Sequence, residues 1–279
     1  MPEWQLVDDG TPVRQGDLLV LRHPRSLLCQ ETVIVLTADC DIAQSKTSDG
    51  YAGLSVIPLT QYVRQHWASK HAKKVVSSDL IELVNTFNKV ASESKPAQKP
   101  LSSSAIIQWV KREDSSKICS ALNVVDNKLQ KKLTRCVQKL FALSNLERSA
   151  GQDTCFDEIC TYYSIKNESS SDVAKELITK KVRTELTSLP EDVFLLSSFP
   201  DKPNDPYVVL LRSLVAIPFD KVTTSAEQAR EENLYLRYGR LAHAFKYAVS
   251  QQFALLYSRV GLPAAYDQQK KALAESFAC

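Results

Sequence analysis

Three short runs of apolar and β-branched residues follow one another near the start of the chain, at 18–21, 32–37 and 54–57. Gly16 precedes the first run and Pro58 closes the third, and both residue types interrupt regular structure. Runs of this length between turn signals are typical of strands, and the continuous second run indicates a strand buried on both faces. Three strands with short connections predict the start of a small, strongly bent antiparallel sheet or barrel.

Helical spacing replaces this pattern over the middle of the chain. Residues 78–87 predict a helix whose first two residues are cap formers, and apolar residues recur every three or four positions over 126–148. Residues 171–186 predict a further helix, and the stretch 92–104, rich in Ser and containing two Pro, predicts a polar loop. Pro190 ends this helical block.

Strand signals return after the helical block, at 193–196, 207–211 and 214–217. A single sheet built from both ends of the chain is a simple way to bury six short strands, and two separate domains are the alternative. Beyond Ser225, apolar residues over 241–260 again follow a helical period. The chain is therefore predicted to be α+β, with a small antiparallel β-barrel at 1–60 and 190–222, a helical insert at 61–189 and a C-terminal helical segment at 223–279.

Composition narrows the classes of function. Gly is scarce, with 7 residues against 12 Pro, which argues against a glycine-rich phosphate loop. The formal net charge of +3 is too small to indicate a nucleic-acid or membrane partner by itself, so local clusters of charge decide. The 7 cysteines form no C-x-x-C pair, and neither a leader sequence nor an apolar run of membrane length is found. These features predict a reduced, cytoplasmic protein without a membrane partner, and they indicate no particular cofactor.

The end of the second predicted strand carries the first candidate site, Asp39-Cys40-Asp41 with Lys46 close behind. In a strand, Asp39 and Asp41 point to the same face. Two carboxylates with a lysine nearby have the chemistry to hold a divalent metal for phosphodiester cleavage. The alternative, which we favour, is a polar strand exit whose aspartates bond to loop amides.

Two interpretations of the cysteines are weaker. Cys40 lacks a histidine close to it in the sequence that would activate it as a nucleophile. Cys155 and Cys160, taken with His66 or His71, have none of the spacings of common zinc sites. We therefore treat these residues as ordinary thiols.

The second candidate site is electrostatic and lies in the predicted helix at 126–148. Five basic residues recur every three or four positions, so they share one helix face, and no acidic residue interrupts them. Such a stripe has the spacing to follow a phosphate backbone, whereas most charged helix faces are only solvated. Basic clusters at 70–74 and 180–183 extend the surface in this interpretation. The five residues are Lys128, Lys131, Lys132, Arg135 and Lys139.

The third candidate is the last predicted helix, with Arg237, Arg240, His243 and Lys246. Its apolar face is most simply interpreted as core packing, and the alternative is a docking surface for a partner protein. The segment 259–263 is either a capped helix end or part of such a surface.

The N-terminal strands also resemble a known family. Residues 16–21, 33–39 and 54–59 are similar to the opening of the PemK/MazF-type SH3-like barrel. In that family an early Gly-Asp enters the first long strand, a second strand ends in Ser or Thr near an Asp, and a third ends in Pro-Leu or Pro-Ile. The Thr-x-Asp-Cys-Asp strand exit and the ending at 259–263 also resemble uncharacterised bacterial proteins associated with phage-defence gene clusters.

The resemblance implies an SH3-like barrel and a role in a bacterial antiviral defence or toxin-like system. It also places Thr37 and Asp39 at the RNA-facing strand end of the family, and whether the chain is an enzyme stays open. We favour a non-catalytic or weakly catalytic component whose helical insert binds nucleic acid, RNA or DNA, or a partner protein of the same system. One rival is a toxin-type endoribonuclease with Thr37, Asp39 and Asp41 at its site, and another is a protein-binding adaptor.

Overall fold

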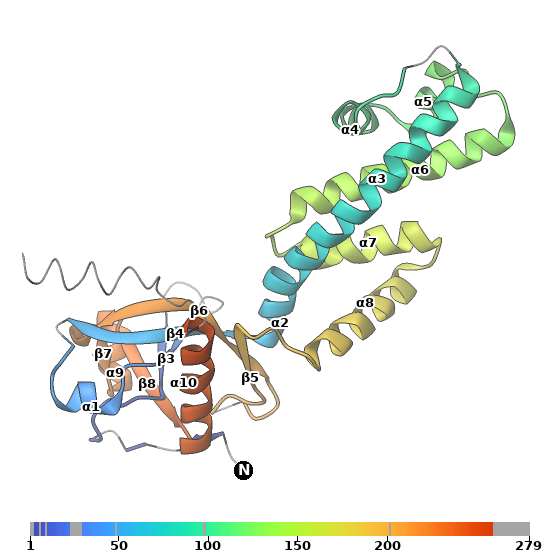
Figure 1. Cartoon of the computed structure of the whole chain (residues 1–279). Coiled ribbons are helices and arrows are strands. Elements are labelled where there is room, and N and C mark those ends of the chain that lie inside the picture. The colour runs from blue at the N-terminus through green and yellow to red at the C-terminus, as the bar shows by residue number, and fades with distance from the viewer. Residues whose placement is uncertain are drawn as a thin grey trace, which may run out of the picture. The chain divides into compact units, whose positions relative to one another are not determined.

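The structure of the chain is a computed structural model (Figure 1). The chain divides into two compact units. Residues 1–59 together with 189–279 form the sheet unit, and residues 60–188 form the helical unit. The residues that the structure describes are 3–5, 7–8, 10–22, 30–47, 49–96, 99–200 and 202–258.

Antiparallel pairing joins strands from both ends of the chain into one sheet. The strand order is β1-β8-β2-β3-β4-β6-β5, and β7 pairs in parallel with β8. The longest contact is β4 against β6, paired from Gly50–Pro218 to Pro58–Tyr207. All six predicted strand segments lie in this sheet. The strands are β1 (Trp4–Gln5), β2 (Asp17–Arg22), β3 (Gln30–Val35), β4 (Gly50–Pro58), β5 (Val193–Leu196), β6 (Tyr207–Pro218), β7 (Val222–Thr223) and β8 (Tyr235–Leu241).

The sheet is open, so the predicted closed barrel is not confirmed. Its path ends at β1 and at β5, and no pairing among the residues described above joins these two edges. The edge strands are 2 and 4 residues long. Closure of a barrel depends on strand tilt and stagger, which the apolar pattern of single strands does not specify.

Two features of the strands correct the predictions. Residues 207–211 and 214–217 belong to one strand, β6, because a register shift in its pairing with β4 lets the ladder continue through Arg212 and Ser213. In addition, β8 lies inside the segment 223–279, for which helical structure is predicted. Its two arginines stand three positions apart and imitate a helical face, but both are buried in the sheet unit.

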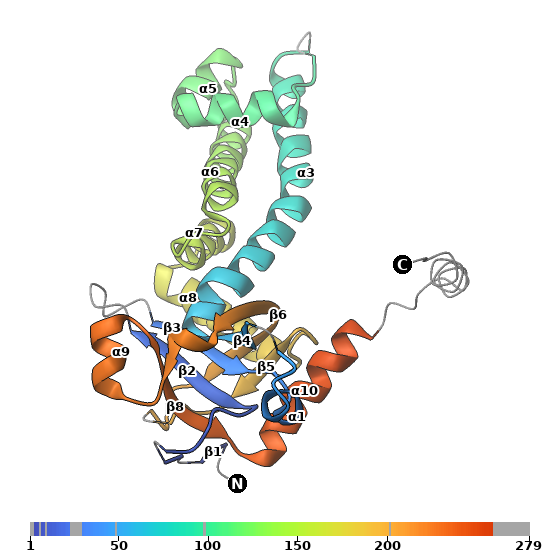
Figure 2. The same ribbon diagram turned by 90° about the vertical axis from the view of Figure 1, so that its left-hand side faces the viewer.

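One helix covers a face of the sheet. Phe245, Val249 and Phe253 of α10 (His243–Tyr257) pack against the core that contains Leu18 and Leu54. Neighbouring strand residues point to opposite faces, so Leu19 belongs to a second, smaller cluster. The short helices α1 (Asp39–Ala43) and α9 (Ala226–Glu232) complete the unit, and α9 and α10 flank the sheet from opposite sides (Figure 2).

Side-chain caps begin several helices of the helical unit. Ser102, Asp114, Asp126 and Ser170 each accept a hydrogen bond from a backbone amide in the first turn of the helix that follows. The elements are α2 (Leu59–Tyr62), a π-helical turn (Val63–Trp67), α3 (Ala68–Ser94), α4 (Ser103–Arg112), α5 (Ser115–Ala121), α6 (Asn127–Ser149), α7 (Cys155–Asn167) and α8 (Ser171–Leu186).

The predicted helices at 126–148 and 171–186 correspond to α6 and α8, but the predicted cap at Ser78 and Asp79 is wrong. The helix α3 passes through both residues without a break. Asp79 accepts a hydrogen bond from the hydroxyl of Tyr162 on α7, 83 positions away in the chain. A local pattern cannot distinguish such a buried partner from a cap.

The core of the helical unit lies between α3, α4, α5 and α6. Phe87, Ile106, Ile118, Leu133 and Leu140 meet there with no exposed surface. Since α6 contributes one face to this core, its opposite face is left to solvent.

Replacement of Gly50 by Ala tests the pairing of β4 with β6. A Cβ atom at this position lies 2.3 Å from the carbonyl oxygen of Ile217, so the two strands must separate. We expect Gly50→Ala to lower the free energy of unfolding by about 1–3 kcal/mol, measured by denaturant titration. Gly10→Ala, whose Cβ meets nothing within 4 Å, is the matched control and should change it by less than about 0.5 kcal/mol. Equal losses in the two variants would contradict this register.

Candidate functional site

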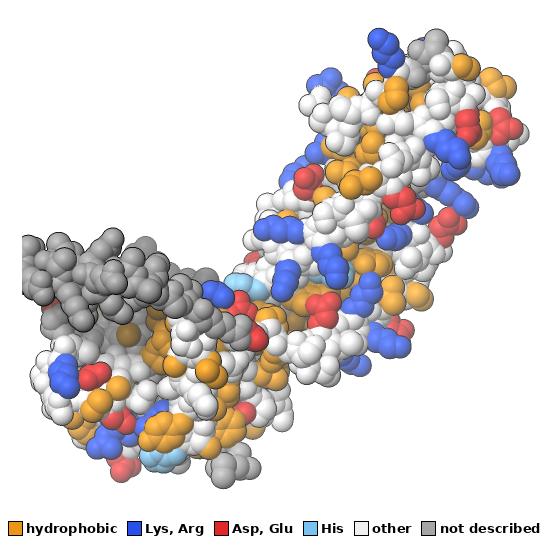
Figure 3. All heavy atoms as spheres, viewed as in Figure 1, with side chains coloured by type: hydrophobic (Ala, Val, Ile, Leu, Met, Phe, Trp, Pro, Cys, Tyr) orange, Lys and Arg blue, Asp and Glu red, His pale blue; other side chains and the backbone are white. Residues whose placement is uncertain are grey.

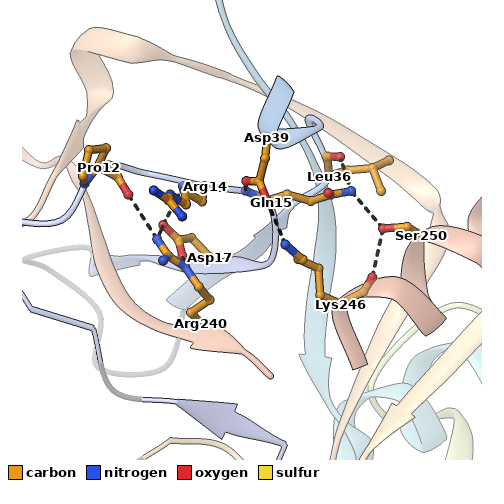
Figure 4. Close-up of polar contacts among 9 residues, drawn as sticks. All are labelled: Pro12, Arg14, Gln15, Asp17, Leu36, Asp39, Arg240, Lys246 and Ser250. Atoms are coloured by element: carbon orange, nitrogen blue, oxygen red, sulfur yellow. Dashed lines mark hydrogen bonds and ion pairs between the residues drawn. The ribbon is translucent and has the colours of Figure 1, made fainter. Parts of the chain in front are cut away.

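The predicted catalytic segment leaves β3 through the short helix α1 and not as an extended strand. Because helical residues turn by about 100° each, Asp39 and Asp41 point in different directions, which corrects the prediction that they share a face. Asp39 accepts hydrogen bonds from the backbone amide of Gln15 and from Nζ of Lys246, both at 2.8 Å (Figure 4). Asp41 forms a long surface ion pair with Lys46, at 3.9 Å.

Asp39 is the ion-pair partner of Lys246, which lies in the first turn of α10. The lysine side chain is 6% exposed, whereas that of Asp39 is 40% exposed. Burial by itself raises the pKa of Asp39, but hydrogen bonds from Lys246 and Gln15 and the positive charges of Lys246 and Arg14 outweigh it and lower the pKa. Asp39 is therefore a stable carboxylate that neutralises a buried cation.

Thr37 ties the end of β3 to β4. Its hydroxyl accepts a hydrogen bond from the backbone amide of Ala52 at 2.8 Å and donates to the carbonyl oxygen of the same residue at 3.4 Å. The threonine is buried. Two of the three predicted catalytic residues, Thr37 and Asp39, are thus engaged in holding the strand exit, which is the arrangement expected of the turn-capping alternative.

A buried ion pair that the sequence analysis missed, Asp17 with Arg240, lies beside this segment (Figure 4). The Asp17 side chain has no exposed surface and accepts hydrogen bonds from Nε and Nη2 of Arg240, the latter at 3.0 Å. The same guanidinium donates to the carbonyl oxygen of Pro12 at 3.1 Å. The pair ties β8 to the start of β2. Arg240 was already a candidate from the sequence, whereas Asp17 was not recognised as its partner.

Arg237 fastens β8 to the N-terminal segment in the same way. Its guanidinium donates to the carbonyl oxygens of Thr11 and Asp8. Arg237 and Arg240 are therefore structural residues of β8 and not ligands on a terminal helix. The apolar face of α10 packs against the sheet, as core packing requires, and the segment 259–263 lies outside the described residues.

The cysteines do not form a metal centre with their neighbours. In the described ranges, no three or more His, Cys, Asp or Glu side chains are placed to share an ion. Cys155 and Cys160 are buried, and burial raises the pKa of both thiols. Cys40 is exposed, and its Sγ lies 3.7 Å from a carboxylate oxygen of Asp41, which does not activate a thiol.

The five basic residues predicted to share a helix face lie on α6, and we call them the basic stripe. Four are exposed and Lys139 is half-buried, while Leu133, Val137 and Leu140 on the opposite side are buried in the core. Within the described part of the chain, one member forms an ion pair, Arg135 with Glu168 at 3.0 Å. The basic stripe consists of Lys128, Lys131, Lys132, Arg135 and Lys139.

Positive charge concentrates in the helical unit. Residues 60–188 contain 21 Lys and Arg and 14 Asp and Glu, a formal net charge of +7. The rest of the chain contains 14 Lys and Arg and 18 Asp and Glu, a formal net charge of −4. Basic side chains lie along the helical unit on the face in view in Figure 3. The value of +3 for the whole chain therefore conceals two units of opposite sign.

The structure brings together the two smaller basic clusters of the sequence. Lys74 comes from the cluster at 70–74, and Lys180 and Lys181 come from the cluster at 180–183. All three line a pocket that α3, α7 and α8 form. Their distance along the chain hides this convergence, which depends on the packing of the three helices.

Comparison of the chain with protein-family models, curated proteins and solved structures gave no significant match. Among the helices of the described residues, none combines the length and the apolar character needed to span a membrane.

Substitution of the two aspartates separates a structural role from a surface role. Asp39→Asn removes the counter-charge of buried Lys246, so we expect it to lower the free energy of unfolding by about 1–3 kcal/mol. Asp41→Asn removes a surface pair and should change it by less than about 0.5 kcal/mol. Denaturant titration of both variants measures the difference, and an Asp39→Asn variant as stable as the wild type would refute the structural role.

Proposed function

We propose that this chain is a nucleic-acid-binding component of a bacterial antiviral defence or toxin-like system, and that the basic stripe on α6 contacts the phosphate backbone. The observation that carries the proposal is the arrangement of that stripe. Its five cations share one helix face without an intervening acidic residue, and four of them are exposed. Lys and Arg placed in this way neutralise phosphates and release counterions.

The length of the stripe suits a short run of phosphates. Lys128 and Lys139 are eleven positions apart, which corresponds to about 16 Å along a helix axis. At about 3.4 Å per nucleotide along one strand of a duplex, this length spans on the order of five phosphates. The ion pair of Arg135 with Glu168 is exposed on both sides, and such pairs are weak enough to exchange for a phosphate.

The stripe supports binding without strong preference for a base sequence. Its members are four lysines and one arginine, residues whose phosphate contacts set position and affinity but do not read bases. The net charge of +7 on the helical unit adds long-range attraction, and the −4 of the rest of the chain limits it.

The assignment to a defence or toxin-like system draws its support from the N-terminal strands. Their order and their turn residues resemble the PemK/MazF-type SH3-like barrel, so we propose that the open sheet is a variant of that barrel that carries the helical unit as an insertion. The insertion joins β4 to β5, where Leu59 and Leu189 mark its two ends. A partner protein of the same system is a second ligand that the exposed insertion could take.

Endoribonuclease activity of the PemK/MazF type is a second candidate function. It rests on Thr37, Asp39 and Asp41, which follow one another at the end of β3. The hydrogen bonds of Thr37 to Ala52 and the ion pair of Asp39 favour binding without cleavage, since both side chains are engaged in contacts that hold the strand exit.

Neutralising the basic stripe tests the proposal directly. With all five residues replaced by Gln, we expect weaker binding to single-stranded RNA and DNA, and a slope of log K against log salt that is smaller by about 3.5, or 0.7 per lost contact. Fluorescence anisotropy at several salt concentrations measures both quantities.

The matched control removes the same charge from other exposed positions of the helical unit. It replaces five lysines that lie outside the stripe by Gln, so the two variants have equal net charge. If both variants lose affinity equally, the stripe is not the interface. The control lysines are Lys73, Lys89, Lys111, Lys117 and Lys175.

Incubation of the protein with RNA, with and without magnesium, separates binding from cleavage. We expect intact RNA under both conditions, analysed by denaturing gel. Cleavage that disappears in a folded Asp39→Ala variant but persists in Asp41→Asn would instead establish Asp39 as part of an endoribonuclease site.

A further inference from the structure

A pocket of about 550 Å³ lies within the helical unit, between α3, α7 and α8. Of these helices, α7 packs against both α3 and α8, and Figure 1 shows α7 between the other two. None of the residues of the basic stripe lines the pocket. A concave site of this volume is in the range that small ligands occupy, so its chemistry is a question separate from that of the stripe.

The lining of the pocket is cationic. Four lysines reach it, Lys74 from α3, Lys166 from α7, and Lys180 and Lys181 from α8, against two acidic residues. One acid, Asp79, is already matched, because it accepts hydrogen bonds from Nζ of Lys166 and from the hydroxyl of Tyr162, both at 2.5 Å.

The second acid, Glu185, is also engaged, although its partner is neutral. It accepts a hydrogen bond from Nε1 of Trp67 at 2.7 Å. Lys181 donates to the hydroxyl of Tyr163 at 2.9 Å, and an ammonium group has two further protons to donate. Lys74 and Lys180 are exposed and form no ion pair among the described residues. An excess of positive charge therefore faces the pocket.

His71 also lines the pocket, and the charges of Lys181 and Lys74 act on it. Burial, the charges of Lys181 and Lys74, and only partial compensation by Glu185 lower its pKa below the usual 6.5. Its Nε2 is 3.4 Å from the hydroxyl of Tyr163, which in turn contacts Lys181. Binding of an anion would offset the repulsion from the lysines, so it would favour the protonated imidazole.

The aromatic rings of the site are already stacked, which limits the kind of ligand. One face of His71 lies on Trp67, with ring centroids 4.7 Å apart, and Tyr163 stacks with His71 at 6.0 Å. The ammonium of Lys181 lies 4.3 Å from the Tyr163 ring centroid. A nucleobase therefore finds no open pair of rings, whereas phosphate oxygens find ammonium, hydroxyl and imidazole groups.

We propose that this pocket binds a phosphate-bearing small molecule through its phosphate groups, with Lys74, Lys180 and Lys181 as the cationic contacts and Tyr163 and His71 as hydrogen-bonding partners. The site goes beyond the nucleic-acid interface on α6, and it uses different residues. The pocket volume of about 550 Å³ is large enough for a diphosphate group.

Calorimetric titration of the full chain with pyrophosphate, ADP and adenosine tests the ligand class. Pyrophosphate and ADP should bind with dissociation constants that agree within about tenfold, a difference of about 1.4 kcal/mol or less, and adenosine should not bind. Failure of pyrophosphate to bind, or binding of adenosine as tight as that of ADP, would overturn the proposal.

A matched pair of double variants locates the site. Lys74→Gln with Lys180→Gln removes two pocket lysines, one from α3 and one from α8, and we expect it to weaken pyrophosphate binding by about tenfold or more. Lys73→Gln with Lys175→Gln removes two lysines that are also exposed, from the same two helices but outside the pocket, and should leave binding within about twofold. Equal losses in the two variants would show that general charge, and not the pocket, attracts the anion.

The pKa of His71, followed by NMR with and without pyrophosphate, gives a readout that a surface ion does not move. The pocket predicts a higher pKa in the complex, and therefore tighter binding as the pH falls through that pKa. An unchanged pKa at saturation would place the anion elsewhere. The variant with the basic stripe replaced should keep both the binding and the pKa shift, which distinguishes failure of this site from failure of the nucleic-acid proposal.

Discussion

The pairing of β4 with β6 is the constraint on which the architecture depends. It joins a strand from the first part of the chain to a strand that follows the helical unit, over the register from Gly50–Pro218 to Pro58–Tyr207. The approach is close enough at Gly50 that the backbone of Ile217 occupies the space of a side chain. Because β4 ends where α2 begins, this ladder holds together the two parts of the sheet unit that the helical unit separates in the sequence. The described helices of the insertion contribute no strand to the sheet and no residue to its main core cluster. Their outer faces are therefore free to carry charge.

The two units use charge in different ways. In the sheet unit, several buried charged groups have partners of opposite charge: Asp17 pairs with Arg240, and buried Lys246 pairs with the partly exposed Asp39. Glu3 likewise accepts hydrogen bonds from the backbone amides of Ser197 and Ser198, at 2.8 and 3.0 Å. Such groups cannot leave their partners without a large desolvation penalty, so their role is structural. In the helical unit, four of the five cations of the basic stripe are exposed, and among the described residues one of the five, Arg135, forms an ion pair, with Glu168. These groups can exchange water for phosphate.

Sequence patterns predicted the elements whose cause is local. The apolar runs at 18–21 and 54–57 lie in β2 and β4, and the periodic stretch at 126–148 is α6, with its basic face exposed. The strand β8 escaped prediction because its arginines are buried through partners that lie more than two hundred positions away, such as Asp17 for Arg240. The same applies to Asp39, whose partner Lys246 is 207 positions distant. Without that partner, a carboxylate at a strand end suggests catalysis as readily as structure.

The most direct test of the central claim, that nucleic acid binds the outer face of α6, is lysine acetylation of the free and the oligonucleotide-bound protein, read by mass spectrometry. We expect protection of Lys128, Lys131 and Lys132 in the complex, while Lys89 and Lys175, exposed on other helices, keep their reactivity. Protection that spares α6, or that falls equally on all exposed lysines, would contradict it.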